Sequence, residues 1–171
     1  MKRIKPPSSK SRRRSPQWFW IALSAVISAI LFTTWLAVNA MVPTASMAPT
    51  IRAGQFVFGW RPAYLHNAPA RGDIVILRHP ELTDQLLVKR VVAVGGDTVA
   101  IRGGAVYVNG LPLSEPYATL SKTQNVPILT VPTGFCYVLG DNRAASNDSS
   151  CWADPFVPVS ELVAKVLWIY G

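Results

Sequence analysis

The sequence has few residues that could bind a metal ion or form disulfide bonds. It contains two histidines and two cysteines among 171 residues, and these four are not clustered. Because metal centres need several such ligands close together, we expect no metal and no cofactor. The sequence also lacks internal repeats, and no convincing amphipathic helical pattern occurs after residue 41, which leaves β structure as the expectation for that region.

Positive charge is confined to one end of the chain. Seven of the 17 lysine and arginine residues lie in residues 1–14, which contain no acidic residue, so the remainder holds ten basic and nine acidic residues. A basic tail beside an apolar run is typical of a cytoplasmic membrane flank, whereas a DNA-binding protein needs positive charge on its folded surface. We therefore expect residues 1–16 to form a cytoplasmic tail, and we expect no nucleic-acid partner.

Charge is absent over a long stretch that follows this tail. No charged residue occurs in residues 15–51, and residues 18–38 (WFWIALSAVISAILFTTWLAV) are almost wholly apolar, which is enough to cross a bilayer as a helix. The alternative is a cleaved signal peptide, because VNA at 38–40 has small residues at a suitable spacing. Secretory apolar regions usually have only about 7–15 residues, so we favour a retained transmembrane anchor over 17–40 with residues 41–171 outside the cytoplasm.

The outer part of the chain has the pattern of a β protein. Short runs rich in valine, isoleucine and aromatic residues are separated by glycine and proline turns, such as the NG at 109–110. The expected strands are DIVIL (73–77), LLVKRVVAV (86–94), TVAI (98–101), AVYV (105–108) and FCYVL (135–139). The pattern predicts a mostly β, compact antiparallel barrel or folded sheet, with residues 111–134 as a long excursion.

The segment VPTASMAPT, residues 42–50, places a serine between two prolines just after the apolar run. A serine on a turn usually only caps local backbone groups. A nucleophilic role for Ser46 requires a base within hydrogen-bonding reach. His66 and His79 both lie in polar, proline-flanked loops, and the more interesting candidate base is Lys89.

Lys89 interrupts an expected strand whose alternate residues Leu87, Val91 and Ala93 share its face. It could guard an edge strand or extend its ammonium to water. If its amine is buried instead, desolvation lowers the lysine pKa and yields a neutral amine able to act as a base. Alternation alone leaves these alternatives open. The loop GDNRAASNDSS, residues 140–150, could supply a hydroxyl to orient the lysine.

Three motifs in the order SMAPT, LVKRVVAVGGD and GDNRAASNDS, behind an N-terminal anchor, resemble type I signal peptidase. This family consists of membrane-bound serine endopeptidases that remove signal peptides from exported preproteins. The resemblance covers nearly all of residues 42–149. It implies a mostly β fold and a location in the bacterial inner membrane with the N-terminus cytoplasmic. It also implies preprotein substrates with small residues before the cut and contact with the lipid bilayer, and no obligatory protein partner is evident.

The resemblance also implies a role for individual residues. Ser46 matches the nucleophile and Lys89 the general base. Thr44 matches the hydroxyl that forms the oxyanion hole together with the Ser46 backbone N–H. The matches in the supporting shell are Ser146, which hydrogen-bonds the lysine, Asp141 and Arg90, which form an ion pair, and Asp148, which holds the loop.

The sequence departs from the family pattern directly after the third motif. Many members have an arginine where this chain has Ser150, so Asp148 is expected to lack its usual partner. Cys136 and Cys151 flank the loop in a compartment where disulfides form, and we favour a bond between them that would compensate for this loss. The competing interpretation is that Cys136 is a buried strand residue.

The expected anchor ends only about six residues before Ser46, which would hold this serine at the outer membrane surface where signal peptides emerge. Met47, Phe56, Phe58 and Trp60 could form a lipid-contacting surface, although Phe56 and Phe58 fit the core side of a strand equally well.

The sequence leaves two functional alternatives open. One is a peptidase of the same superfamily that matures a conjugative pilin or other secretion-system precursor, and the other is a non-enzymatic anchored β domain. A self-cleaving repressor is disfavoured by the membrane span.

Overall fold

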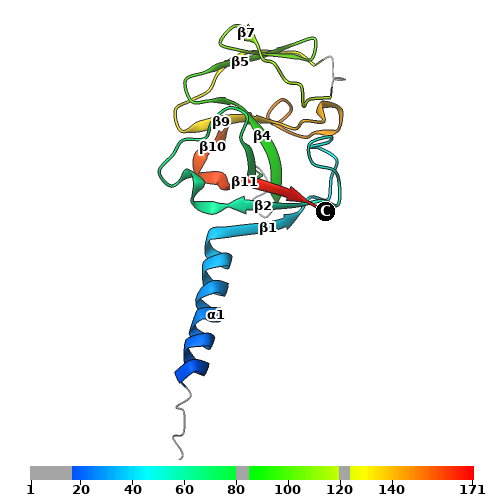
Figure 1. Ribbon diagram of the computed structural model, residues 1–171. Helices are drawn as coiled ribbons and strands as arrows, with labels where there is room; N and C mark the ends of the chain where they lie inside the picture. The colour runs from blue at the N-terminus through cyan, green and yellow to red at the C-terminus, as the bar shows by residue number, and fades with distance from the viewer. Residues whose placement is uncertain (1–16, 80–84, 120–123) are drawn as a thin grey trace, which may run out of the picture.

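The computed structural model describes residues 17–79, 85–119 and 124–171, so the expected tail at residues 1–16 lies outside the described residues. Its two parts are a helix, α1 (Gln17–Leu36), and a β domain from which this helix projects (Figure 1). The helix has 20 residues, none of them buried, and within the described residues it alone is long and apolar enough to span a membrane. At 1.5 Å per residue its length is about 30 Å, the thickness of a bilayer core.

The helix ends earlier than the sequence suggested. It stops at Leu36, and residues Ala37–Met41 form strand β1, so the expected anchor over 17–40 is wrong at its last four residues. β1 pairs with β2 (Phe56–Trp60) in an antiparallel register that joins Val38 to Gly59. Val38 is buried in the domain core, and its neighbours' backbone groups bond to β2. These contacts favour a strand over further helix.

A seven-stranded antiparallel sheet forms most of the domain, in the order β1-β2-β11-β3-β4-β9-β10. Its further strands are β3 (Ile74–Arg78), β4 (Leu86–Val94), β9 (Phe135–Leu139), β10 (Val157–Pro158) and β11 (Leu162–Tyr170). Three short 3-10 helices lie between the strands: η1 (Arg61–Tyr64) after β2, η2 (Arg143–Ala145) after β9 and η3 (Val159–Glu161) before β11. The strands predicted near β3, β4 and β9 are present, whereas β11 was not predicted although it lies near the centre of the sheet.

A smaller sheet of four strands, in the order β7-β6-β5-β8, lies at the end of the domain farthest from α1 (Figure 1). Its strands are β5 (Thr98–Arg102), β6 (Ala105–Val108), β7 (Leu111–Pro112) and β8 (Val126–Thr130). The predicted NG turn joins β6 to β7, with positive φ at both Asn109 and Gly110. Buried residues of β5 and β6 pack on β4 and β9, which joins the two sheets. The expected mostly β, antiparallel fold is confirmed.

A second core cluster fixes the segment between β1 and β2. Met47 and Ile51 are fully buried there, together with Val57 and Ile76. The expectation that Met47 contributes to a lipid-contacting surface is therefore wrong, because its side chain anchors the segment in the core.

The outer face of β1, β2 and β11 exposes large apolar side chains. Trp168 is 68% exposed, and the ring of Phe56 stacks on that of Tyr170 at 5.6 Å. The other exposed members are Met41, Phe58 and Leu167. Figure 1 shows β1 and β2 at the side of the domain where α1 leaves it. We call these six residues the apolar face.

Candidate active site

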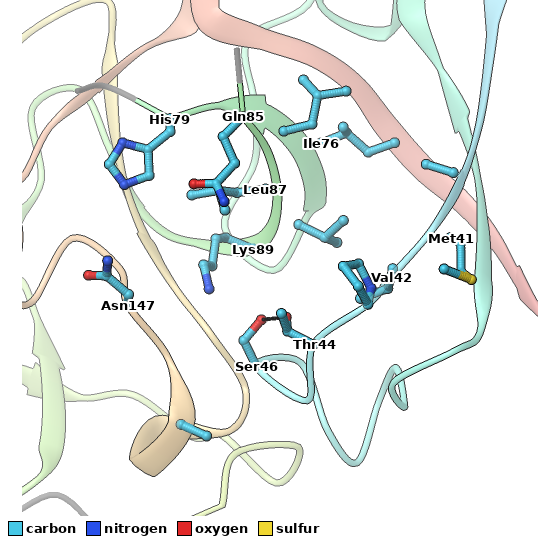
Figure 2. Close-up of a pocket in the computed structure, with 15 residues that line it drawn as sticks. Met41, Val42, Thr44, Ser46, Ile76, His79, Gln85, Leu87, Lys89 and Asn147 are labelled. Atoms are coloured by element: carbon cyan, nitrogen blue, oxygen red, sulfur yellow. Dashed lines mark hydrogen bonds between the residues drawn. The ribbon is translucent and has the colours of Figure 1, made fainter. Parts of the chain in front are cut away.

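Ser46 lies in a turn that the protein core holds in place. The segment is tied down at both ends, since Val42 N donates to Gln55 O and Ile51 N donates to Met47 O. Ser46 itself is only 8% exposed. Its Oγ lies 3.2 Å from the Thr44 Oγ1, and the two hydroxyls face each other at one wall of a cleft (Figure 2).

Lys89 lies on β4, where it pairs with Val75 of β3. It is only 2% exposed, and β4 is an interior strand of the sheet, so the edge-strand and water-exposed alternatives are wrong. The Lys89 Nζ donates to Ser146 Oγ at 3.0 Å, and the amine points toward Ser46 (Figure 2). Removal from water disfavours the charged form of an amine, and a lysine that acts as a base must be in the neutral form.

The expected set of apolar neighbours around Lys89 is only partly correct. A register shift between Val91 and Ala93 breaks the alternation of β4. Val91 packs with Val75 and Leu77, whereas Ala93 belongs to the other core cluster together with its sequence neighbour Val92. The sequence pattern could not reveal this bulge, because it depends on the pairing with β9.

The loop after β9 holds the serine turn by its backbone. Asn142 N donates to Ser46 O at 3.0 Å, and Asn142 Nδ2 donates to Ala45 O at 3.1 Å. Gly140 lies so close to the site that a Cβ there would stand 2.3 Å from Ser146 Oγ and 2.5 Å from Ser46 O. Sequence reasoning missed both positions, since only the fold shows that the glycine lies against the two serines.

The ion pair of Arg90 and Asp141 lies behind these residues. Arg90 Nε and Nη2 donate to the two carboxylate oxygens at 2.8 and 2.7 Å, and Thr50 Oγ1 donates to Oδ2 at 2.5 Å. Desolvation opposes the charge of Arg90, but the hydrogen bond and attraction of Asp141 outweigh it, so the pKa of Arg90 lies above its ordinary value. Thr50 connects this pair to the serine segment, a contact that the sequence did not suggest.

Asp148 has partners within its own loop. Its carboxylate accepts from Gly140 N at 2.9 Å and from Ser150 Oγ at 2.7 Å. Gln124 Nε2 in turn donates to Ser150 O. Ser150, which stands where many relatives have an arginine, thus supplies a neutral donor to Asp148 in place of that usual charged partner.

The expected disulfide is absent, and both cysteines are free. Cys136 is fully buried on β9, where its Sγ contacts Val157 O at 3.6 Å, and burial raises the pKa of this thiol to about 12. Cys151 is exposed, and its Sγ contacts Asn147 Oδ1 at 3.3 Å. The strand directs one thiol into the core while the turn after Asp148 directs the other to solvent, which explains why they do not meet.

Ser46 and Lys89 line a cleft of about 280 Å³. One wall is formed by β1, an edge strand, and by the segment that follows it, and the other by residues 86–89 of β4, which pair with β3. The lining residues are mostly apolar toward β1 and more polar where His79, Gln85 and Asn147 lie (Figure 2). His79 packs against the ring of Trp152 at 5.2 Å between centroids, whereas His66 is exposed and does not line the cleft.

The geometry assembles the parts of an acyl-transfer site. A hydroxyl on a fixed turn, a buried amine facing it and a second hydroxyl beside it are the elements of the Ser–Lys variants of serine hydrolases. Every residue expected at the site lies in this region, and the predicted contacts between Lys89 and Ser146 and between Arg90 and Asp141 are present. The cysteine pair is the exception.

Comparisons with known proteins agree with this class. The family model described as signal peptidase, peptidase S26, matches residues 15–171. A probable signal peptidase I-1 of Synechocystis is 34% identical over 155 residues, which cover 86% of this chain and 78% of the relative. A signal peptidase I of Bacillus licheniformis is 32% identical and covers 78% of this chain and 76% of that protein.

Among solved structures, a signal peptidase I of Enterococcus faecalis is similar with a TM-score of 0.50 and 31% identity, and the match covers 60% of this chain and 98% of that one. The chain belongs to the signal peptidase family, peptidase S26. The family resemblance of the three motifs is thereby confirmed, and the chain is an enzyme, a serine endopeptidase that cleaves signal peptides. The comparisons do not favour the pilin-maturing alternative, and the non-enzymatic alternative is wrong.

Proposed function

We propose that this signal peptidase uses Ser46 as its nucleophile and Lys89 as its general base. Neutral Lys89 Nζ accepts the proton of Ser46 Oγ while this oxygen attacks the carbonyl carbon of the scissile peptide bond. The burial of Lys89 and the orientation of its amine toward Ser46 are the observations that carry the proposal. The hydrogen bond to Ser146 fixes the amine, since a lysine side chain otherwise samples many rotamers.

Collapse of the tetrahedral intermediate breaks the C–N bond, and the ammonium of Lys89 gives its proton to the leaving amine. The same amine, neutral again, accepts a proton from the water that attacks the ester, and it gives this proton to Ser46 Oγ as the C–Oγ bond breaks. The developing oxyanion needs two donors, and we assign them to the Ser46 backbone N–H and the Thr44 hydroxyl. The 3.2 Å separation of the Thr44 and Ser46 hydroxyl oxygens supports this assignment.

The substrate we propose is the signal peptide region of an exported preprotein, bound in an extended conformation. β1 lies at the edge of the sheet and lines the cleft, which suits a chain that adds to it as a further strand. The apolar part of the lining, which includes Val42, Ile76 and Val88, suits the small residues expected before the cut.

The test is cleavage by the full-length protein in lipid vesicles. We expect it to cut a general preprotein after its signal peptide, at a site verified by N-terminal sequencing of the mature product. A pilin precursor supplied under the same conditions serves as the competing substrate. Efficient cleavage of the pilin precursor with none of the preprotein would contradict the general role.

The protein is membrane-anchored, and we propose that its N-terminus is cytoplasmic and its β domain lies outside the inner membrane. The seven basic residues before α1 support this orientation, and the apolar face beside the exit of the helix suits contact of the domain with the bilayer. Protease added to intact spheroplasts is expected to degrade the β domain. Protection of the domain until detergent is added would show that the orientation is reversed.

A further inference from the structure

Residues 115–119, which lie outside the three motifs, contact the loop after β9 that contains Asp141 and Ser146. After β7 the chain returns over residues 140–143, where Thr119 N donates to Asp141 O at 2.8 Å. In the same segment, the Glu115 carboxylate forms an ion pair with Arg143 Nη2 at 2.5 Å. The two side chains are only 9% and 10% exposed, so this pair is much less accessible to solvent than an ordinary surface salt bridge.

Arg143 connects the Glu115 carboxylate to the backbone beside Ser46 and Ser146. Its Nε donates to Gly140 O at 3.1 Å while Nη2 is held by Glu115. Gly140 is the residue whose absent Cβ leaves room for Ser46 and Ser146. One guanidinium therefore bridges Glu115 and the peptide against which the two serines lie.

The same segment contacts the second cation of the site. Tyr117 OH donates to Glu115 Oε1 at 3.3 Å, and the guanidinium carbon of Arg90 lies 3.8 Å from the centre of the Tyr117 ring. Burial is the largest cause of the rise in the pKa of Tyr117 to about 12, so its hydroxyl stays protonated at neutral pH. Glu115 thus orders both Arg143 and, through Tyr117, the arginine next to Lys89.

We propose that Glu115 is a positioning residue for the dyad of Ser46 and Lys89, acting chiefly through Arg143 and Gly140. The inference rests on the proposed function. Loss of the Glu115 charge leaves a nearly buried guanidinium without its carboxylate, which is costly and favours a shift of Arg143. Gly140 would move with it, and a displacement of about 1 Å in a catalytic group can slow turnover about 100-fold.

The experiment compares Glu115→Gln with wild type on one preprotein, in vesicles and below the unfolding temperature. We expect kcat to fall about 10- to 100-fold while KM changes less than about twofold, because Glu115, Arg143 and Gly140 do not line the cleft. Glu115→Asp, which keeps the charge on a shorter side chain, should recover part of kcat. An unchanged kcat in Glu115→Gln would overturn the proposal.

A matched control separates positioning from general stability. Asp97→Asn alters another arginine–carboxylate pair, Arg71 with Asp97, away from the cleft. We expect it to lower the melting temperature without lowering kcat. If Asp97→Asn lost as much kcat as Glu115→Gln, the loss in Glu115→Gln would be explained by lower stability of the domain, and the proposal would be overturned.

A double-mutant cycle tests the route through Arg143. Once Arg143→Met has removed the bridge, adding Glu115→Gln should lower kcat less than twofold further, whereas independent effects would multiply. Multiplying effects would overturn the route. If Arg143→Met does not fold, Arg143→Lys serves in its place, since lysine lacks the second arm needed to reach both partners. Ser46→Ala separates this inference from the proposed function. If Ser46→Ala retains activity, the proposed function is overturned. If Ser46→Ala is inactive and Glu115→Gln has the wild-type kcat, this inference alone is overturned.

Discussion

Replacement of Lys89 by methionine or alanine is expected to lower the cleavage rate by about 10⁴-fold or more while the domain remains folded. Methionine has a similar length and suits the buried position, and it removes the only group assigned to accept the Ser46 proton. Lys89→Arg should fail equally, because a guanidinium does not give up its proton at any ordinary pH. Ser46→Ala should be as inactive as Lys89→Met, since the two residues act as one unit.

These variants are measured by preprotein cleavage, with circular dichroism and thermal unfolding as checks on the fold. In the wild type, turnover should rise with increasing pH, because the neutral amine alone accepts a proton. His66→Ala is the matched control with full activity, and His79→Ala should keep substantial activity although its ring lines the cleft. Activity in Lys89→Met together with none in His79→Ala would transfer the role of base to the histidine.

Gly140→Ala is expected to reduce kcat by at least about 100-fold through one added methyl group. That carbon would stand 2.3 Å from Ser146 Oγ and 2.5 Å from Ser46 O, and the second of these is a backbone atom that cannot rotate away. The turn with Ser46, the loop with Ser146 or both must therefore shift. The Lys89 amine would then lose its alignment with the nucleophile.

The control is Gly95→Ala, in a turn outside the cleft. Its added carbon would also be crowded, at 3.0 Å from Pro132 O and from Thr133 Cα. We expect a lower melting temperature for both variants but a large loss of kcat for Gly140→Ala alone. If Gly140→Ala cleaves the preprotein at the wild-type rate, the close contact of the loop with the serine turn is not required for catalysis.

The sequence predicted the site better than its surroundings. Ser46, Lys89 and Ser146 were assigned because three short motifs resemble those of type I signal peptidase in residue type and in order. Glu115 gave no such signal, since a glutamate in a proline-rich excursion is common, and Gly140 begins the third motif but received no role from it. Their importance depends on contacts between segments distant in the sequence, which no local pattern contains.

The errors in the fold have a similar origin. The segment 37–40 is uncharged like the helix before it, and its pairing with β2 distinguishes it as a strand. The pattern of β11 is interrupted by Lys165, which is accommodated by an ion pair with Asp73, a residue far away in the sequence. The cysteines were close enough in sequence to suggest a bond, but the direction of each side chain is set by β9 and by the turn after Asp148.

The direct continuation of α1 into β1 leaves no linker between the membrane span and the folded domain. Ser46 follows the last helical residue, Leu36, by ten positions. Strand β1 lies between the two, and the buried Met47 directly follows Ser46. A flexible tether would let the nucleophile sample a range of heights above the bilayer, whereas this connection restricts it to a narrow one. With Ser46 as the proposed nucleophile, we expect the enzyme to select cleavage sites by their distance from the lipid, so that the length of a substrate's own apolar helix would determine which peptide bond reaches Ser46.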